Sequence, residues 1–430
     1  VDEAHSPEVG LNPLGYNPFP GLRPFSIEES HLFFGREGQV DEILEKLSIN
    51  RSVTILGYSG SGKSSLLYCG LVPVLYGGFM TQTGPNWQVI TTRPGNSPIQ
   101  NLTEAILHQL EQAGKLTPED RPIQHAIIKS LLTSREDGLV EVAEYMQRHN
   151  QENLFLLVDQ FEELLRFREQ GEENINESIQ FVNLLIHAVH QTRLPVFVAL
   201  SLRSDFIGEC SVFHGLTEVI NTSNYLVPQM TREQKRKAIE GPVAVGGGKI
   251  TNRLIKKLLS DIGDHQDQLP IMQHALMRTW DYWSANREPG EAMDIRHYNA
   301  IGRISQALSL HANEAYEELT SNEKEIAEVL FKSLTEKNQE NQGLRRPTKI
   351  KFVAELAGTT EEEVIKVVDC FRRTGRSFLM PGSHVTLTGA STIELSHESL
   401  MRIWTRLLNW VDEEFESAQL YKRISEAAAL

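Results

Sequence analysis

The string GYSGSGKS at residues 57–64 constrains this chain more than any other feature of its sequence. It fits the pattern G-x-x-x-x-G-K-[ST], follows the β-like run Ser52–Leu56 and precedes a helix-like stretch after Lys63. In that context a glycine-rich turn joins a strand to a helix, and such a turn can direct its backbone amides at a phosphate group. The sequence therefore predicts a loop that binds the phosphate tail of a nucleotide.

Each position of this loop has an expected role. Lys63 places a positive charge at the β- and γ-phosphate oxygens, and Ser64 offers its hydroxyl to Mg²⁺. The glycines allow the backbone to turn closely around the phosphates. The other residues that we expect to contact the nucleotide are Gly57, Ser59, Gly60, Ser61, Gly62 and Ser65.

A second motif, NLFLLVDQFEE, ends an apolar strand with Asp159 and places Glu162 and Glu163 just beyond it. Parallel sheets bind ligands at the carboxyl ends of their strands. Asp159 is therefore expected to hold Mg²⁺ through its water shell, together with Ser64. Either Glu162 or Glu163 could orient or deprotonate the attacking water, and the sequence leaves open which one does so.

A third motif, VFVALSLRSDF, places Arg203 and Asp205 at the end of another predicted strand. Arg203 could reach the γ-phosphate and so distinguish ATP from ADP. It could equally pair with Asp205 or with a surface carboxylate, and both readings stay open at this point.

Residues 25–228 alternate short β-branched runs with helical patterns, which predicts an α/β domain with a parallel sheet and helices on both faces. The strand at the phosphate-binding loop belongs to this sheet. The predicted strands are Ser52–Leu56, Trp87–Thr92, Leu154–Val158, Val196–Leu202 and Tyr225–Val227.

The rest of the chain divides by pattern into smaller parts. Proline-rich residues 1–24 predict an extended N-terminal linker. Residues 229–310 predict an α-helical lid domain, and residues 311–412 follow the order helix, helix, helix and hairpin that is typical of a winged helix. The hairpin is predicted at Ser377–Met380 and His384–Leu387, and the polar insert Glu336–Arg346 is predicted to be a loop. A connector helix, 413–430, leads toward a C-terminal region that is expected to lie outside this chain.

The composition excludes several classes of protein. The chain has 57 acidic residues against 42 basic ones, so its net charge repels a nucleic-acid backbone. Its 3 cysteines are far apart and predict neither a disulfide framework nor a zinc site. No window is apolar over the length of a membrane span. We expect a cytoplasmic protein without a membrane partner, and a segment of a longer chain, because it starts at Val1.

With these motifs in hand, the chain resembles the STAND class of signal-transduction P-loop ATPases, and within it the bacterial "novel STAND" domain often found beside WD-repeat propellers. The resemblance covers nearly the whole chain. The segments that carry it are FPGLRPF, FFGRE, GYSGSGKSSLL, LLVDQFEELL, ALSLRSDF, QLPIMQHALMRTW and ELSHESLMRIWTRLLNWVDEE. One departure is that Gln160 and Phe161 follow the first aspartate, where the family often has glycine.

The resemblance implies roles that the residues alone do not. Gly35 and Arg36 of FFGRE are similar to a turn that contacts adenine and ribose in related proteins. Pro270 is similar to a helical-domain proline that packs near adenine. His397 resembles the winged-helix histidine that reaches the β-phosphate of ADP in closed, resting members of the class.

The resemblance also implies a mechanism and partners. An ADP-bound closed state opens on ATP binding, self-associates and controls linked sensor and effector domains outside this segment, in bacterial defence or stress signalling. Hydrolysis of ATP is expected to be slow, and the cofactors are ATP or ADP with Mg²⁺. Two alternatives remain: an AAA-type ATPase motor, and a DNA-binding regulator that uses Lys366, Arg372, Arg373 and Arg376 of the winged helix. The acidic residues around that cluster dilute its positive charge and argue against a nucleic-acid partner.

Overall fold

The chain forms two compact units, and each is described by itself. A computed structural model describes residues 16–78, 86–147, 152–169, 171–263, 268–337 and 343–429. The P-loop unit comprises Phe25–Thr231, and the C-terminal unit comprises Arg232–Leu430 together with the N-terminal segment that ends at Pro24. The predicted linker at 1–24 lies outside the described residues for positions 1–15.

The P-loop unit is built on a five-stranded sheet in the order β2-β3-β4-β1-β5. All neighbouring pairs are parallel, with Val158 of β3 opposite Leu200 of β4, and Leu56 of β1 opposite Leu202 of β4. The predicted parallel sheet is therefore confirmed. The strands are β1 (Ser52–Gly57), β2 (Trp87–Thr92), β3 (Asn153–Val158), β4 (Val196–Arg203) and β5 (Asn224–Leu226).

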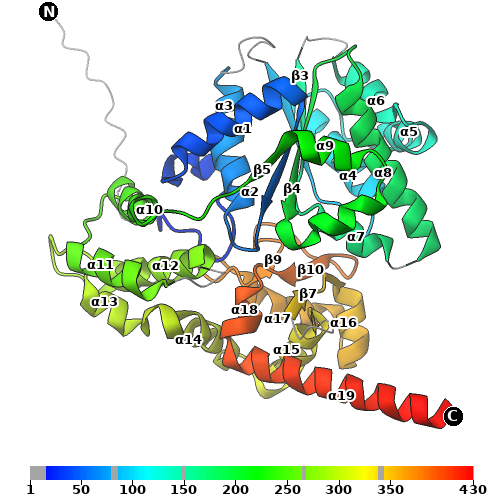
Figure 1. Cartoon of the computed structure of the whole chain (residues 1–430). Coiled ribbons are helices and arrows are strands. Elements are labelled where there is room, and N and C mark those ends of the chain that lie inside the picture. The colour runs from blue at the N-terminus through cyan, green and yellow to red at the C-terminus, as the bar shows by residue number, and fades with distance from the viewer. Residues whose placement is uncertain are drawn as a thin grey trace, which may run out of the picture. The chain divides into compact units, whose positions relative to one another are not determined.

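Helices cover both faces of this sheet (Figure 1), and alternate residues of each strand pack on opposite sides. In β3, Leu154 and Leu156 face one core, while Phe155 and Leu157 face the other. Strands buried on both faces form continuous apolar runs, which explains why they could be predicted. The first core involves α4 (Pro98–Gln112), α5 (Arg121–Ser134), α6 (Gly138–Gln147), α7 (Glu162–Arg168), α8 (Glu172–His190) and α9 (Leu216–Ser223).

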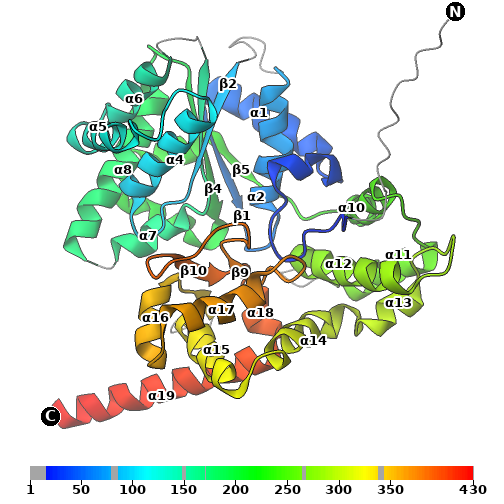
Figure 2. The ribbon, with the colours of Figure 1, turned by 180° about the vertical axis from the view of Figure 1, so that it is seen from behind.

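The second core contains helical segments that flank the phosphate-binding loop. They are α1 (Glu37–Asn50), the π-helix η2 (Leu66–Leu71) and α3 (Val72–Tyr76), with α2 (Lys63–Ser65) directly after the loop. Two 3₁₀ segments, η1 (Ile27–Leu32) and η3 (Ser204–Val212), complete the unit. Figure 2 shows these layers from behind.

The C-terminal unit begins with helices that hold the N-terminal segment. The amide of Asn17 donates to Met277 O at 2.9 Å and to Asp281 Oδ1 at 2.8 Å, and Phe19 packs edge-on against Trp280. These contacts fix the segment on α12. The helices here are α10 (Arg232–Val245), α11 (Asn252–Asp261), α12 (Gln268–Asn286), α13 (Ile295–Ala300) and α14 (Arg303–Glu317).

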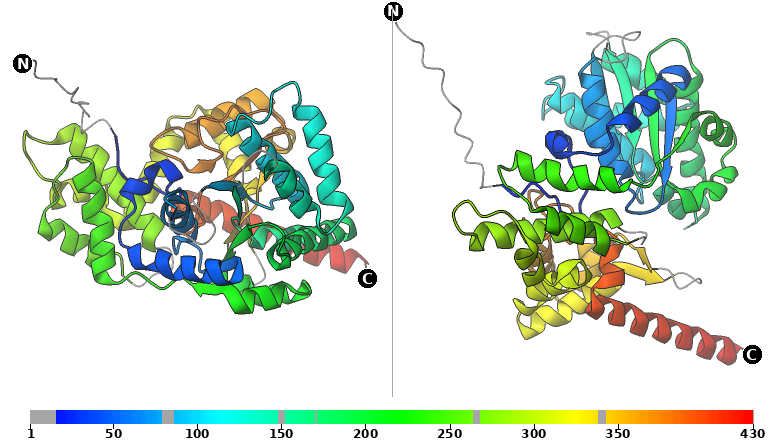
Figure 3. Two further views of the ribbon diagram at one scale, coloured as in Figure 1. Left: turned by 90° about the horizontal axis from the view of Figure 1, so that it is seen from above. Right: turned by 60° about the vertical axis from the view of Figure 1, so that its left-hand side comes forward.

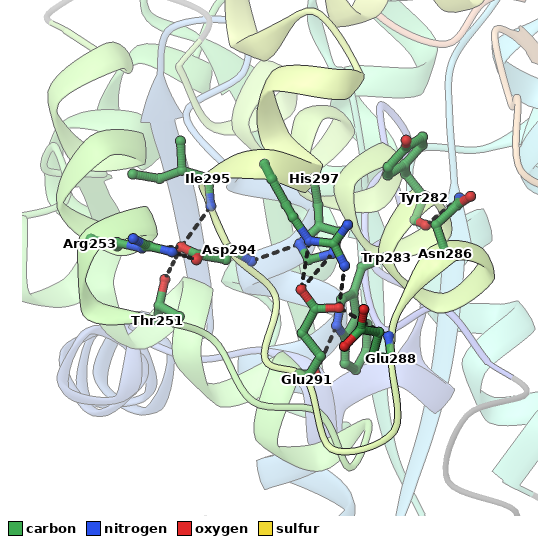
Figure 4. A network of polar contacts seen from close by, with 11 residues as sticks. Thr251, Arg253, Tyr282, Trp283, Asn286, Glu288, Glu291, Asp294, Ile295 and His297 are labelled. Carbon is green, nitrogen blue, oxygen red and sulfur yellow. Dashed lines mark hydrogen bonds and ion pairs between the residues drawn. The ribbon is translucent and has the colours of Figure 1, made fainter.

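A polar network joins α11 to the start of α13 (Figure 4). The carboxylate of Asp294 accepts hydrogen bonds from Thr251 Oγ1 and Arg253 Nε, each at 2.7 Å, and from the N–H of Ile295 at 2.8 Å. The Arg253 hydrogen bond, opposed by partial burial, holds the pKa of Asp294 well below its usual range. Asp294 thus caps α13 and ties it to the preceding helix.

The remainder of this unit shares one core of helices and a small sheet in the order β8-β10-β9. Thr320 begins α15 with a capping box, in which its side chain accepts from the N–H of Glu323. The elements are α15 (Ser321–Ser333), β8 (Thr348–Lys349), α16 (Ile350–Ala357), α17 (Glu361–Arg372), β9 (Leu379–Met380), β10 (Thr392–Leu395), α18 (Ser399–Ile403) and α19 (Thr405–Ala429). Figure 3 shows α19 as a long terminal helix.

Two local predictions in this unit are wrong. The second hairpin strand was expected at His384–Leu387, but β10 lies at Thr392–Leu395, where Ile393 and Leu395 are buried. The polar stretch Glu336–Arg346 looks like a loop in the sequence, yet β6 (Thr335–Lys337) and β7 (Gly343–Arg345) pair antiparallel there. In the part of the chain that the structure describes, no helix is both long and apolar enough to span a membrane.

Candidate nucleotide site

The phosphate-binding loop leaves β1 at Gly57 and enters α2 at Lys63. Gly60 and Gly62 have φ of 72° and 89°, a region that side chains with a Cβ rarely adopt. A Cβ on Gly57 would lie 2.6 Å from Ser61 Oγ, so a larger residue there would require the serine side chain to move. Gly60 and Gly62, both predicted from the motif, are therefore needed for the shape of the loop itself.

Lys63 lies inside this loop. Its ammonium donates to the carbonyl oxygens of Gly57 at 2.8 Å and Tyr58 at 2.9 Å, and the side chain is buried. The carbonyl oxygens of the loop thus fix the position of the Lys63 ammonium. That position is suited to neutralising phosphate oxygens at the carboxyl edge of the sheet.

Asp159 lies at the end of β3 and is fully buried. Ser64 Oγ is 2.9 and 3.0 Å from its two carboxylate oxygens, and the Tyr68 hydroxyl donates to Oδ2 at 3.1 Å. Arg93 Nη2 lies 3.5 Å from the same Oδ2. The structure therefore brings together the two predicted metal-binding residues and adds two that the sequence reasoning missed.

Ser64 and Asp159 fit a magnesium ion. Mg²⁺ takes oxygen ligands and is usually bound through one or two protein groups plus phosphate oxygens and waters. A hydroxyl and a carboxylate within hydrogen-bond distance of each other, beside a phosphate-binding loop, are such a pair. When bound, the metal would neutralise charge on the phosphate tail.

The two candidate bases differ in their surroundings. Glu162 is buried, and its Oε2 accepts the N–H of Arg203 at 3.2 Å. Burial raises its pKa, and the charges of Lys63 and Arg203 only partly oppose that effect. Glu163 instead accepts the N–H of Gly95 at 3.1 Å, in the loop after β2. Glu162 is therefore a buried carboxylate on which the charge of Lys63 acts. Glu163 instead binds the backbone of the loop after β2.

Arg203 is engaged by a neighbour. Its Nη2 and Nε donate to the two oxygens of Asp205 at 2.6 and 3.2 Å, and its guanidinium lies over the Phe206 ring. Burial raises the pKa of Asp205, but the hydrogen bond and charge of Arg203 outweigh it, so that pKa lies below its usual range. The structure thus shows the pairing with Asp205, and contact with a γ-phosphate stays a prediction.

The turn before the loop contains Gly35 and Arg36. Gly35 has φ of 90° and donates its N–H to Glu37 Oε1 at 2.9 Å. The buried guanidinium of Arg36 donates to Ser61 O at 2.9 Å, Pro228 O at 2.7 Å and Gln39 Oε1 at 2.9 Å. Arg36 therefore connects the phosphate-binding loop to the segment after β5, and an adenine or ribose contact stays a prediction.

Comparison with known proteins places the chain in a family. The sequence model of the family described as Novel STAND NTPase 1 matches residues 18–430. The chain belongs to this family. The resemblance seen in the sequence is thereby confirmed, and the chain is a P-loop NTPase. No curated protein matches the sequence.

Solved structures resemble this STAND NTPase only distantly. The Aeropyrum pernix ORC2 protein in its ADPNP-ADP complexes is 11% identical with a TM-score of 0.48, over 89% of this chain and 95% of that chain. The Aeropyrum pernix ORC1 protein in complex with DNA is 13% identical with a TM-score of 0.44, over 90% and 94%. Domain III of the Thermotoga maritima replication initiation protein DnaA is 15% identical with a TM-score of 0.38, over 64% and 93%. At these values the likenesses carry no information about function.

Pro270 and His397 of the STAND NTPase belong to the C-terminal unit, so their roles toward a nucleotide stay predictions. Pro270 lies in the first turn of α12. His397 Nδ1 accepts the N–H of Ser399 at 3.1 Å and lies 2.7 Å from Ser399 Oγ. The adjacent Glu398 is 2% exposed and bound by Arg345 Nε at 3.0 Å, which fixes the turn that carries the histidine.

Two residues of the STAND NTPase site were missed from sequence. Arg93 directly follows β2, and the rule that ligands bind at strand ends could have identified it. Tyr68 gave no such signal, because its position depends on the π-helix η2, a rare irregularity often found at functional sites. Ser65 accepts the N–H of Phe25 at 3.2 Å, so it fixes the start of the unit beside the loop.

Proposed function

We propose that this STAND NTPase is a nucleotide-controlled signalling switch. ADP holds a closed resting state, and ATP binding opens it into a form that self-associates and controls linked sensor and effector domains in bacterial defence or stress signalling. The observation that carries the proposal is the Ser64–Asp159 pair beside the P-loop, in a member of the Novel STAND NTPase 1 family.

The tautomer of His397 supports a phosphate contact. A backbone N–H can only donate, so the bond from Ser399 N requires that Nδ1 carry no proton. The proton of the neutral ring is then on Nε2, which becomes a donor suited to a phosphate oxygen. A contact with the β-phosphate of ADP requires such a donor, because the phosphate oxygens accept hydrogen bonds.

A switch also needs an energy difference between its two states. Turning a 1:99 mixture into 99:1 takes about 5.5 kcal/mol of differential affinity. One hydrogen bond to a charged group supplies about 1.5–3 kcal/mol, so the His397 contact covers part of it. The linked sensor domain supplies the rest.

Slow hydrolysis is part of the proposal. The Oε2 of Glu162 is engaged by the N–H of Arg203, and that carboxylate is buried beside the charge of Lys63. This oxygen can accept a proton from an attacking water only after the bond with the Arg203 N–H is broken or shared. We therefore propose that turnover rises only after activation.

The basic residues that suggested a DNA regulator are engaged within the protein. Lys366 pairs with Glu323, Arg372 with Asp369, and both Arg373 and Arg376 pair with Glu318. Arg372 and Arg376 are also buried. Each of the four cations is thus paired with a carboxylate, which lowers the positive charge offered to a phosphate backbone and supports a proposal without a nucleic-acid partner.

The nucleotide that co-purifies with the protein tests the proposal. Protein is denatured, and the released nucleotide is identified by chromatography for the wild type, His397→Ala and the control His384→Ala, whose histidine is exposed in the same unit. We expect ADP in the wild type and the control, and about 10-fold weaker retention in His397→Ala. Empty sites in all three, with rapid ATP turnover, would support a motor instead.

A further inference from the structure

The hydroxyl of Tyr68 contacts the Asp159 carboxylate although it lies outside the phosphate-binding loop. It donates to Asp159 Oδ2 at 3.1 Å, and Ser64 Oγ lies 2.9 and 3.0 Å from the two oxygens of the same carboxylate. The backbone of Asp159 is fixed separately, because its N–H donates to Thr92 O at 2.9 Å. Asp159 is fully buried, so its carboxylate depends on hydrogen-bond donors of the protein. These side-chain donors therefore set how the carboxylate is turned.

The direction of the hydrogen bonds around Tyr68 is also determined. The Tyr68 hydroxyl has a second hydrogen bond, with the side chain of Arg93. A guanidinium has donors and no acceptor, so in that bond the phenol oxygen accepts. The one proton of the hydroxyl then goes to Asp159. Arg93, Tyr68 and Asp159 thus form a chain of hydrogen bonds that run in one direction, and such bonds strengthen one another.

The ring of Tyr68 is held by the residues around it. It packs against the buried cluster of Phe25, Leu32 and Cys69. Cys69 Sγ donates to Ser26 O at 3.0 Å, which ties η2 to the start of the P-loop unit. A tyrosine side chain has only two rotatable angles, so a packed ring also fixes the place of its hydroxyl.

Ser64 cannot give the carboxylate the same support. Its hydroxyl is one of the two groups that fit Mg²⁺, so its oxygen is needed by the ion. Mg²⁺ is usually bound through carboxylates, phosphate oxygens and waters, so the phenol of Tyr68 is suited to support a ligand and not to be one. Tyr68 can therefore keep its bond to Asp159 Oδ2 while Ser64 binds the metal.

We infer that Tyr68 is a positioning residue for the metal site, whose hydroxyl holds the Asp159 carboxylate in the orientation that binds Mg²⁺ together with the nucleotide. The inference rests on the proposed function, because it assumes that the P-loop binds a nucleotide with Mg²⁺. Groups that hydrogen-bond a metal-ligating side chain typically contribute about 10- to 100-fold to metal affinity. Loss of the hydroxyl should therefore weaken the part of nucleotide binding that depends on the metal. The contacts of the loop itself with the phosphates should remain.

The test measures the affinity of the non-hydrolysable ATP analogue ADPNP by calorimetry, once with Mg²⁺ and once with the chelator EDTA. Tyr68→Phe keeps the ring and removes only the hydroxyl. The control is Tyr76→Phe, whose side chain is exposed on α3 of the same unit. In Tyr68→Phe we expect ADPNP to bind about 10- to 100-fold more weakly with Mg²⁺, and to change by less than about 3-fold in EDTA. The control should keep both wild-type affinities.

Two results would overturn the inference and leave nucleotide binding intact. Equal weakening of ADPNP with Mg²⁺ and in EDTA would mean that Tyr68 only supports the fold beside the loop. Wild-type affinity of Tyr68→Phe in Mg²⁺ would mean that Asp159 does not need the hydroxyl. A wild type that binds no ADPNP under either condition would instead end the proposed function itself. Thermal unfolding without nucleotide shows whether Tyr68→Phe is folded, and Tyr68→Met replaces it with the same expectation if it is not.

Discussion

Replacing Arg36 with methionine should destabilise the P-loop unit. The guanidinium donates three hydrogen bonds, two of them to the backbone carbonyls of Ser61 and Pro228, which lie far apart in the sequence. Methionine has a similar length but no donor, so these buried carbonyl oxygens would lose a charged partner.

The magnitude follows from these contacts. Hydrogen bonds to a charged group contribute about 1.5–3 kcal/mol each, so the gross loss is on the order of 4–9 kcal/mol. Part is recovered, because burial of the guanidinium is unfavourable and lowers the pKa of Arg36 to about 10. A net loss of about 2–4 kcal/mol remains, which lowers the melting temperature by about 5–15 °C for a unit of this size.

Thermal and urea unfolding without nucleotide measure this loss. Arg121→Met is the matched control, because its side chain forms only surface ion pairs, and it should change stability by less than about 1 kcal/mol. If Arg36→Met is as stable as the wild type but loses nucleotide affinity, Arg36 does not connect the loop to the segment after β5. The direct nucleotide contact implied by the family resemblance would then be the better account.

Further predictions concern Glu162, Glu163 and Arg345. Glu162→Gln should lower phosphate release at least about 100-fold, and Glu163→Gln less than about 10-fold; the reverse order would assign the base to Glu163. Since burial raises the pKa of Glu162 in the folded state, its ionisation destabilises the fold as the pH rises above the ordinary value of 4.5. Glu162→Gln should therefore raise the melting temperature more at pH 8 than at pH 5, and an equal gain at both would contradict this. Arg345→Met should destabilise the C-terminal unit by about 3 kcal/mol in urea unfolding, because the buried Glu398 carboxylate loses a charged hydrogen-bond donor; no change would refute it.

The sheet of the P-loop unit could be predicted from the sequence because its strands are buried on both faces. The predicted Leu154–Val158 differs from β3 by one residue, and the predicted Val196–Leu202 differs from β4 by one residue. Such strands are continuous apolar runs whose identity does not depend on distant partners. The loop glycines and Lys63 could be predicted for a similar reason, because the contacts and backbone angles that fix them lie within the motif itself.

Features set by distant contacts could not be predicted in this way. His384–Leu387 has a β-branched pattern, but the strand forms at Thr392–Leu395, where Ile393 and Leu395 fill the core. Arg36 binds a carbonyl 192 positions away, and the sequence does not indicate that partner. The same holds for Tyr68, whose hydroxyl reaches Asp159 across 91 positions.

Calorimetric titration of Mg-ATP and Mg-ADP into the wild type and Lys63→Ala tests the central claim most directly. The ammonium of Lys63 is fixed over the loop by the carbonyls of Gly57 and Tyr58, and it should provide much of the attraction for a phosphate tail. We predict that both nucleotides bind the wild type and that Lys63→Ala weakens each at least about 10-fold. Affinity that is absent from the wild type, or unchanged in the variant, would contradict the account.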